Sequence, residues 1–546
     1  MNSDAVPRGE TAAAPRRHDF DALRAFAMML GIALHAGLAF APIPWLVMNS
    51  DTSSAIGTFI EVLHGFRLPL FFLMSGYFSA MLLQRRGTAG FLTHRGKRIA
   101  LPLLLGSVTI IPITWGVLLG GHALLRAVPA EPREWSTPAG DDATIWRAAA
   151  NGNLDTVKGL VLTGTPVDQP DPQFFTLPLA WAATGDHADV VAFMLEHGAN
   201  PNQRMGDDNT PVYTACFFGA SDSLALLLEA GGDLSTQNAH GETPIDAMQH
   251  DAAVVGFISS LLDVDVEFDR VQAGRTEIEL MLAAVAVTPP ARRLIRDRVA
   301  GLLTGELLMH LWFLWHLCWL AVGLVVGRLL LRLLAWNTLP DGIVSSPLCL
   351  LGLIPLTALT QSWQKHFGAD TSTSLIPAWH VLLHYAVFFA FGALMHRSPR
   401  AADRLGRTWW LYTSVSVASC FLALQLMHDP TFAVGVRLDE HTRAWLVAAM
   451  QSVFVWTSLF GLIGLARRVL SRPRPWVRYA SDSAYWLYIA HLPLAIGGQF
   501  AFAYVPFHPI LEFMLLTAAT TLVLLASYQL CIRHTWLGLL LNGTRR

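Results

Sequence analysis

Ten long apolar stretches constrain the fold of this chain more than any other feature. They lie at about residues 22–42, 59–83, 100–120, 307–331, 347–363, 380–396, 409–427, 444–466, 484–505 and 510–531. Roughly 20 apolar residues in a helix are enough to cross the hydrocarbon core of a bilayer, which is about 30 Å thick. The sequence therefore predicts an all-α, polytopic membrane helix bundle of about ten transmembrane helices in a lipid bilayer.

The overall composition agrees with a membrane protein and argues against two other classes. Of the 546 residues, 53% are hydrophobic and only 14% are charged. The net charge of −2 argues against a nucleic-acid partner. The five cysteines form no CxxC pair, so we expect neither a disulfide framework nor a bound metal ion.

The positive charges between the apolar stretches predict the orientation in the membrane. Three connections, 84–98, 396–407 and 467–478, carry 5, 4 and 5 Lys and Arg residues. The two connections 364–379 and 428–443 carry 1 and 2. Because basic loops stay on the cytoplasmic side, we expect both termini there. A cleaved signal peptide ending near Ala41 is the alternative for the first stretch.

A soluble insertion with an internal repeat interrupts the apolar stretches. Leu177-Pro178-Leu179, Thr210-Pro211-Val212 and Thr243-Pro244-Ile245 recur every 33 residues. Apolar helical segments end at Gly164, Gly198 and Gly231, with nearly the same spacing. This period resembles that of ankyrin repeats, although Leu177 stands where Thr is usual. We therefore divide the chain into a membrane part at 1–120, an ankyrin-repeat domain at 141–262 and a second membrane part at 306–535.

The ankyrin-repeat domain follows three spans, so it is expected on the periplasmic side. Stacked repeats present a concave surface that usually binds a protein partner, here unknown. The alternative is an inserted domain with only a structural role. The segment 263–305, which contains Pro289 and Pro290, is expected to return to the membrane as amphipathic helices.

Three polar residues in or beside the first apolar stretch are candidates for catalysis. Asp21, Arg24 and His35 lie where a charged or titratable group costs several kcal/mol unless it has a function or a partner. Arg24 and His35 are eleven residues apart, which places them about 20° apart around a helix and about 16 Å apart along it. We expect His35 near the middle of the membrane and Arg24 near its cytoplasmic edge. Packing of His35 as a satisfied polar residue between helices is the alternative.

Further polar residues lie in or beside the other apolar stretches. Glu61, His64 and Arg67 are spaced to share one face of the second span, and Ser75-Gly76 allows another helix to approach closely. Arg95, Lys97 and Arg98 at the inner surface are candidates for holding phosphates, or else charges that only set the topology. The candidates for acceptor binding or structural support are Glu61, His64, Arg67, Ser75, His310, Tyr488 and His491. For the last three, interfacial or helix packing is the alternative.

These residues together resemble the membrane acyltransferase 3 family. The resemblance rests on Asp21-x2-Arg24-x10-His35 and Phe66-Arg67-Leu-Pro69-Leu-Phe-Phe-Leu-Met-Ser75-Gly76-Tyr77, and is supported by Arg95-x2-Arg98, His310-Leu-Trp-Phe-Leu and Ser483-x-Tyr485-x2-Tyr488-x2-His491-x-Pro493. It covers about residues 18–120 and 306–535 and leaves out the ankyrin repeats.

The resemblance implies acyl transfer across the bilayer. Acyl-CoA would be a co-substrate bound from the cytoplasm, without a tightly bound cofactor, and a periplasmic glucan or another envelope glycan would accept a succinyl or acetyl group. An imidazole suits the base that activates a sugar hydroxyl, so His35 is expected as base or as acyl carrier. Arg24 would bind donor phosphate or stabilise negative charge, and Asp21 would orient Arg24.

Two other functional classes fit part of this pattern. Polar groups in the middle of a membrane also mark the path of a transporter or flippase. The chain shows no internal hydropathy repeat of the kind common in inverted-repeat transporters. A membrane-anchored scaffold, in which the ankyrin repeats carry the function, is the third interpretation.

Overall fold

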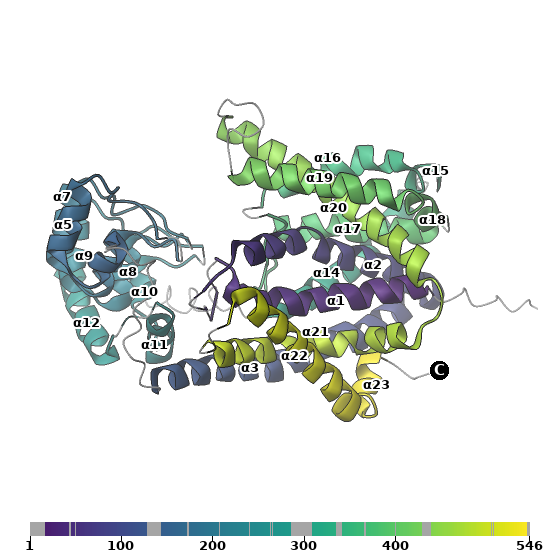
Figure 1. The fold of residues 1–546 in the computed structure, drawn as a ribbon, viewed down its shortest axis with the longest axis horizontal. Coiled ribbons are helices and arrows are strands. Elements are labelled where there is room, and N and C mark those ends of the chain that lie inside the picture. The colour runs from purple at the N-terminus through teal and green to yellow at the C-terminus, as the bar shows by residue number, and fades with distance from the viewer. Residues whose placement is uncertain are drawn as a thin grey trace, which may run out of the picture.

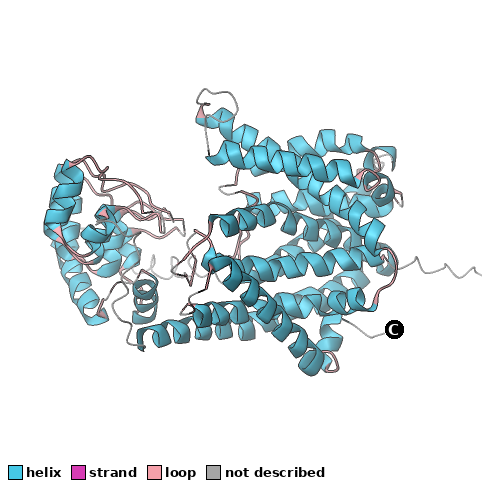
Figure 2. Ribbon diagram, in the orientation of Figure 1, coloured by secondary structure: helices cyan, strands magenta, loops and turns pink. Residues whose placement is uncertain are grey.

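A computed structural model shows a helical bundle with a helical repeat domain at one end (Figures 1 and 2). It describes residues 17–42, 45–47, 49, 51–127, 144–171, 174–206, 208–239, 241–262, 264, 266–284, 308–334, 341–364, 367–398, 400–428, 438–503, 505 and 507–542. These residues form helices and loops and no strand. The predicted all-α class is therefore confirmed over this part of the chain.

The bundle is built from long helices on both sides of the repeat domain in the sequence. The first three are α1 (His18–Gly37), α2 (Ser54–Arg95) and α3 (Leu101–Ala127). The others are α14 (Trp312–Leu333), α16 (Leu350–Gln361), α17 (Trp379–Arg397), α19 (Trp409–His428), α20 (Glu440–Leu470), α21 (Pro475–Phe502) and α22 (Pro509–Ser527). Short helices α15 (Asp341–Val344), α18 (Ala401–Leu405) and α23 (Trp536–Asn542) join or follow them.

Seven of the described helical segments are long and apolar enough to cross a membrane. One of them, Ser54–Gly121, contains two predicted spans. Its helix is interrupted at Gly87, whose φ of 67° is in the left-handed region that favours glycine. Two other predicted spans lie on helices that are not among the seven. One is α16, an apolar helix shorter than the seven, and the other is α21. The structure thus supports a polytopic membrane protein, and the count of ten spans stays a prediction.

Glycine contacts between α2 and α17 hold the centre of the bundle together. A Cβ at Gly76 would lie 1.9 Å from the carbonyl oxygen of Phe389, and a Cβ at Gly392 would lie 1.9 Å from that of Leu73. The two backbones can touch only because both positions lack a side chain. The predicted close approach at Gly76 is confirmed, with α17 as the neighbouring helix.

The repeat domain consists of paired helices, as the 33-residue period predicts. The pairs are α4 (Ile145–Ala150) with α5 (Leu154–Leu162), α6 (Pro178–Thr184) with α7 (Ala188–Glu196), α8 (Pro211–Phe218) with α9 (Ser221–Glu229), and α10 (Pro244–Ala247) with α11 (Ala252–Leu261). Thr210 and Thr243 cap α8 and α10 through their side chains. Leu177 has no side-chain oxygen, so α6 in this imperfect repeat lacks the capping hydrogen bond that the threonines make.

One part of the segment that we expected to return to the membrane joins the repeat domain instead. Helix α12 (Phe268–Ala284) packs against α8 and α9. Arg275 donates to the carbonyl oxygens of Phe217 and His250, both at 2.6 Å. The folded repeat domain therefore continues past residue 262, because α12 packs on its helices α8, α9 and α11. The predicted break at Pro289 and Pro290 lies outside the described residues.

Candidate active site

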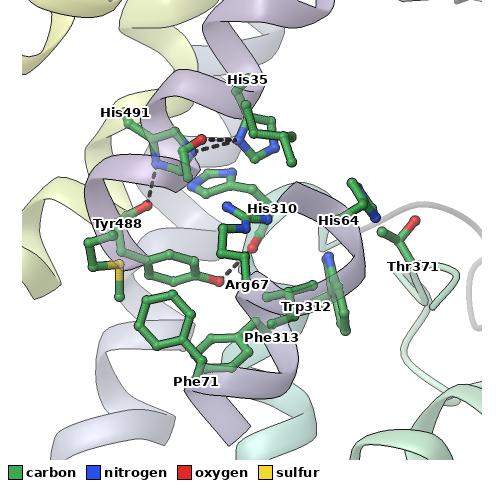
Figure 3. Close-up of a pocket in the computed structure, with 14 residues that line it drawn as sticks. His35, His64, Arg67, Phe71, His310, Trp312, Phe313, Thr371, Tyr488 and His491 are labelled. Atoms are coloured by element: carbon green, nitrogen blue, oxygen red, sulfur yellow. Dashed lines mark hydrogen bonds between the residues drawn. The ribbon is translucent and has the colours of Figure 1, made fainter. Parts of the chain in front are cut away.

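Helices α1 and α21 run side by side in the same direction, and their contact brings the predicted polar residues together. Nη2 of Arg24 on α1 donates to the hydroxyl of Ser481 on α21 at 2.6 Å. Further along both helices, Nδ1 of His35 lies 3.0 Å from Nε2 of His491 (Figure 3). The two contacts are eleven residues apart on α1 and ten on α21, so the predicted helix face of Arg24 and His35 is the face that packs on α21.

Both the side chain and the backbone of His35 are held by hydrogen bonds. Its Nδ1 lies 3.0 Å from the carbonyl oxygen of Gly31, one turn earlier in α1. The side-chain amide of Gln499 donates to the carbonyl oxygen of His35 at 2.7 Å. The Nε2 atom of His35 makes no hydrogen bond with the described residues, and the ring lines a cavity. This nitrogen is therefore available to a substrate.

His310 is attached to α21 at a carbonyl that a proline leaves free. Pro493 has no N–H, so the carbonyl of Ile489, four residues earlier, loses its partner in the helix. Nε2 of His310 donates to this oxygen at 2.9 Å. In return, the hydroxyl of Tyr488 donates to the carbonyl oxygen of His310. The alternative of interfacial packing does not hold for His310, since its side chain is buried in the protein and lines the cavity.

The cavity has a volume of about 60 Å³ and lies where α1, α2, α21 and the start of α14 meet. Figure 3 shows the side chain of Arg67 among the rings of His35, His310 and Tyr488. Arg67 is only 8% exposed, and it makes no hydrogen bond or ion pair with the described residues. Such a buried, unpaired cation attracts a negatively charged group. Apolar and polar side chains complete the lining, among them Met28, His64, Phe71, Trp312, Phe313 and Thr371.

Asp21 and Arg24 lie together but apart from the cavity. Arg24 is 3.7 Å from Asp21, as expected of a residue that Asp21 orients, and the hydroxyl of Ser481 donates to Asp21 at 3.3 Å. Neither of the two charged residues lines the cavity. The guanidinium of Arg24 is therefore placed about three helical turns before His35, and its predicted role with the donor is still a prediction.

The basic residues at the end of α2 and just after it also lie away from the cavity. Arg95 donates to the hydroxyl of Ser79 at 2.7 Å, and Arg98 donates to the carbonyl oxygen of Leu540 at 2.7 Å. Lys97 is exposed. Each arginine keeps further N–H groups that these bonds do not use. Their predicted contact with the phosphates of a donor is not tested by these positions.

The predicted face of the second span is divided between two environments. His64 and Arg67 line the cavity, whereas Glu61 lies 4.0 Å from His428 at the end of α19. Ser75 does not line the cavity either. Residues that follow one another at intervals of three do not stay in line along a helix but drift around it. Glu61, two such intervals before Arg67, therefore faces a different neighbour.

Sequence reasoning missed several residues of the site. Gln499 holds the backbone at His35, Ser481 binds Arg24, and Gly31 lies against Arg67. Gln499 is a polar residue in an apolar helix, which is a signal that the sequence contains. Gly31 is one turn from His35, but nothing local indicates that an arginine packs on it. Among the described residues, no group of three metal-ligand side chains is placed to hold one ion.

The sequence as a whole matches a known family. A family model described as an acyltransferase domain, acyltransferase 3, matches residues 17–143 and 256–529. The chain belongs to this family. A model described as three copies of ankyrin repeats matches residues 145–238, which confirms the predicted repeats.

Curated relatives resemble part of the chain. Proteins named Glucans biosynthesis protein C from Salmonella paratyphi B, Salmonella heidelberg and Salmonella agona are 34% identical to it over 124 residues. The match covers 23% of this chain and 30% of each relative. The chain thus matches less than a third of the length of these relatives. The ankyrin repeats lie in the sequence between the two matched parts of the acyltransferase domain.

Proposed function

We propose that this protein is an integral membrane O-acyltransferase. It moves a succinyl or acetyl group from cytoplasmic acyl-CoA to a hydroxyl of a periplasmic glucan or another envelope carbohydrate. The observation that carries the proposal is a cavity lined by both His35 and Arg67. Neither Nε2 of His35 nor the guanidinium of Arg67 has a hydrogen-bond partner among the described residues. The membership in an acyltransferase family and the name of the partly similar Salmonella proteins support it.

The reaction uses these two groups in one exchange. The acceptor hydroxyl attacks the carbonyl carbon of the thioester while its proton passes to Nε2 of His35. The carbonyl oxygen becomes an oxyanion, and the cationic Arg67 stabilises this charge in a site shielded from water. The C–S bond then breaks, the carbonyl reforms as an ester, and the leaving thiolate takes the proton from His35. The base is regenerated, so one ester and one CoA thiol form in each cycle.

The donor enters from the side on which α1 begins. Arg95 at the end of α2 and Lys97 and Arg98 just after it are proposed to hold the phosphates of CoA. Arg24, bound to Ser481 about three helical turns before His35, is proposed to guide the phosphopantetheine end of the donor. The acyl group reaches the cavity, and most of the negatively charged carrier stays outside the bilayer.

The topology completes the proposal. Ten spans with both termini in the cytoplasm of a bacterial inner membrane agree with the distribution of Lys and Arg. The repeat domain lies beyond the end of the bundle at which α1 ends (Figure 1), so it is proposed to be periplasmic and to bind a protein near the acceptor. A reporter fused at Pro138 tests this side, and a cytoplasmic signal there would contradict the span count.

Mass analysis of periplasmic glucans tests the function. Glucans from cells with the wild-type protein should carry an added mass that identifies both acyl group and acceptor, and this mass should be absent with His35→Ala. His396→Ala is the matched control, because this histidine lies outside the cavity and bonds to Gln84. Equal protein levels are checked by immunoblot. A transporter would move its substrate without acyl-CoA, and a scaffold would keep its function with His35→Ala but lose it when 141–262 are deleted.

A further inference from the structure

His491 and His35 form a pair whose hydrogens can be assigned from the carbonyl groups around them. Nδ1 of His491 lies 2.7 Å from the carbonyl oxygen of Tyr488, and Nδ1 of His35 lies 3.0 Å from that of Gly31. A carbonyl oxygen only accepts hydrogen bonds. Each Nδ1 must therefore carry a hydrogen, because a lone pair there would face another lone pair at hydrogen-bond distance.

This assignment determines the direction of the bond between the two rings. A neutral imidazole carries one hydrogen, so Nε2 of His491 has a lone pair once its Nδ1 is protonated. Nε2 of His491 is 3.0 Å from Nδ1 of His35 and accepts from it, so the one hydrogen on this Nδ1 is shared between His491 and the carbonyl oxygen of Gly31. The hydrogen of His35 is thereby kept on Nδ1, and the lone pair of His35 is on Nε2, toward the cavity.

We infer that His491 is a positioning residue, which holds His35 in the tautomer whose Nε2 can take a proton from the acceptor. The inference rests on the proposed base role of His35 and extends it. In the other tautomer, Nε2 would carry a hydrogen and the base would be lost. When His35 is protonated in the reaction, the bond to His491 also shares the new positive charge, in the way that a carboxylate supports the histidine of a catalytic triad.

His310 does not take the same role. Its Nε2 is bound to the carbonyl oxygen of Ile489, and its Nδ1 has no partner among the described residues. The ring lies edge-on to His491, with 5.0 Å between the centroids. His310 thus supports the ring of His491 by packing, and only His491 is bonded to His35.

The test combines spectroscopy and kinetics on the purified full-length protein in lipid nanodiscs. Spectra of ¹⁵N-histidine-labelled wild type and His35→Gln identify the signals of His35, and they show which ring nitrogen carries the hydrogen. Initial rates are measured with succinyl-CoA or acetyl-CoA and with glucan from cells that lack the protein. The first variant, His491→Phe, removes the atom that accepts the hydrogen bond from His35. The second, His491→Gln, has an amide oxygen that can accept this bond instead.

We expect a protonated Nδ1 on His35 in the wild type and a larger share of the other tautomer in His491→Phe, because only the carbonyl oxygen of Gly31 then still accepts from Nδ1. Loss of an orienting partner of this kind typically costs about 10- to 100-fold, so kcat should fall by that factor while both KM values change less than about twofold. His491→Gln should restore most of kcat. His316→Phe is the control, because this buried histidine also bonds to a carbonyl one turn earlier but does not line the cavity.

Two results would overturn the inference. One is a hydrogen on Nε2 of His35 in the wild type, and the other is an equal loss of kcat in His491→Phe and His491→Gln, which would show a role in packing alone. If the wild type transfers no acyl group, the proposed function fails, but the spectra still decide whether His491 sets the tautomer of His35.

Discussion

The guanidinium of Arg67 lies directly against the backbone of Gly31. A Cβ at Gly31 would lie 2.6 Å from Nη1 of Arg67, closer than such atoms can approach. Gly31 is one turn before His35, so the absence of a side chain there lets the cation of α2 and the imidazole of α1 share one cavity. The geometry of the proposed oxyanion site thus depends on a residue without any chemistry of its own.

Replacing Gly31 by Ala should displace the guanidinium without unfolding the bundle, because the end of an arginine side chain can move. A shift on the order of 1 Å in a catalytic group typically costs up to about 100-fold, so we expect acyl transfer to fall by about 10- to 100-fold. Initial rates and the thermal midpoint of the purified protein measure both effects. Gly323→Ala on α14 is the control, since a Cβ there meets no atom within 4 Å. Wild-type rates in Gly31→Ala would contradict the proposed use of Arg67.

Replacing Arg67 by Met should lower activity but not stability. The loss of one oxyanion-stabilising group typically reduces kcat by about 10²- to 10³-fold. Because Arg67 is buried without a hydrogen-bond partner among the described residues, removing its charge also removes a desolvation cost, and the thermal midpoint should stay or rise. Arg275→Met is the contrast: that guanidinium bonds to two carbonyl groups, and its loss should destabilise the repeat domain. A less stable but fully active Arg67→Met protein would refute the assignment.

Replacing Pro493 by Ala should weaken the attachment of His310. The new N–H can donate to the carbonyl of Ile489 and compete with Nε2 of His310, which now bonds to it at 2.9 Å. We expect a loss of activity of about 3- to 10-fold, corresponding to the roughly 1 kcal/mol of a typical hydrogen bond, with normal expression. Pro112→Ala in α3 serves as the control, because Pro112 is also inside a membrane helix but does not line the cavity. An equal effect of both substitutions would point to a general effect on helices.

The stability of the repeat domain should depend on pH through Glu242. His250, at 3.5 Å, and the hydroxyl of Tyr213, at 2.7 Å, lower the pKa of this carboxyl group from 4.5 to about 2. A pKa that is lower in the folded state contributes stability above the unfolded value, and this contribution is lost as the pH falls from about 4.5 to about 2.

Hydrogen–deuterium exchange of residues 236–250 in the intact protein measures this effect. After correction for the intrinsic exchange rate, protection should decrease between pH 4.5 and 2 in the wild type. Glu242→Gln should have lower protection at pH 7 and little change over the same range. Asp222→Asn on α9, which lies outside this hydrogen-bond network, should behave like the wild type.

Part of the site was predictable because its information is local. The helical period alone places Arg24 and His35 on one face, and the structure has both on the face toward α21. The same period does not determine the surroundings of Glu61, whose neighbour is His428 rather than the cavity. A face defined by three residues is wide, and which part of it meets another helix depends on the rotation of both helices.

The sequence by itself determined the membrane helices, the ankyrin repeats and their 33-residue period, and the polar residues that need a partner or a function in an apolar setting. Only the tertiary structure decided that His491, Gln499 and Arg67 meet at His35 and that α12 covers the repeat domain. The physical reason is that hydropathy and helical periodicity are properties of neighbouring residues. Contacts between residues more than 450 positions apart depend instead on how closely and at what rotation the helices pack, which here is set by side chains as small as those of Gly31 and Gly76.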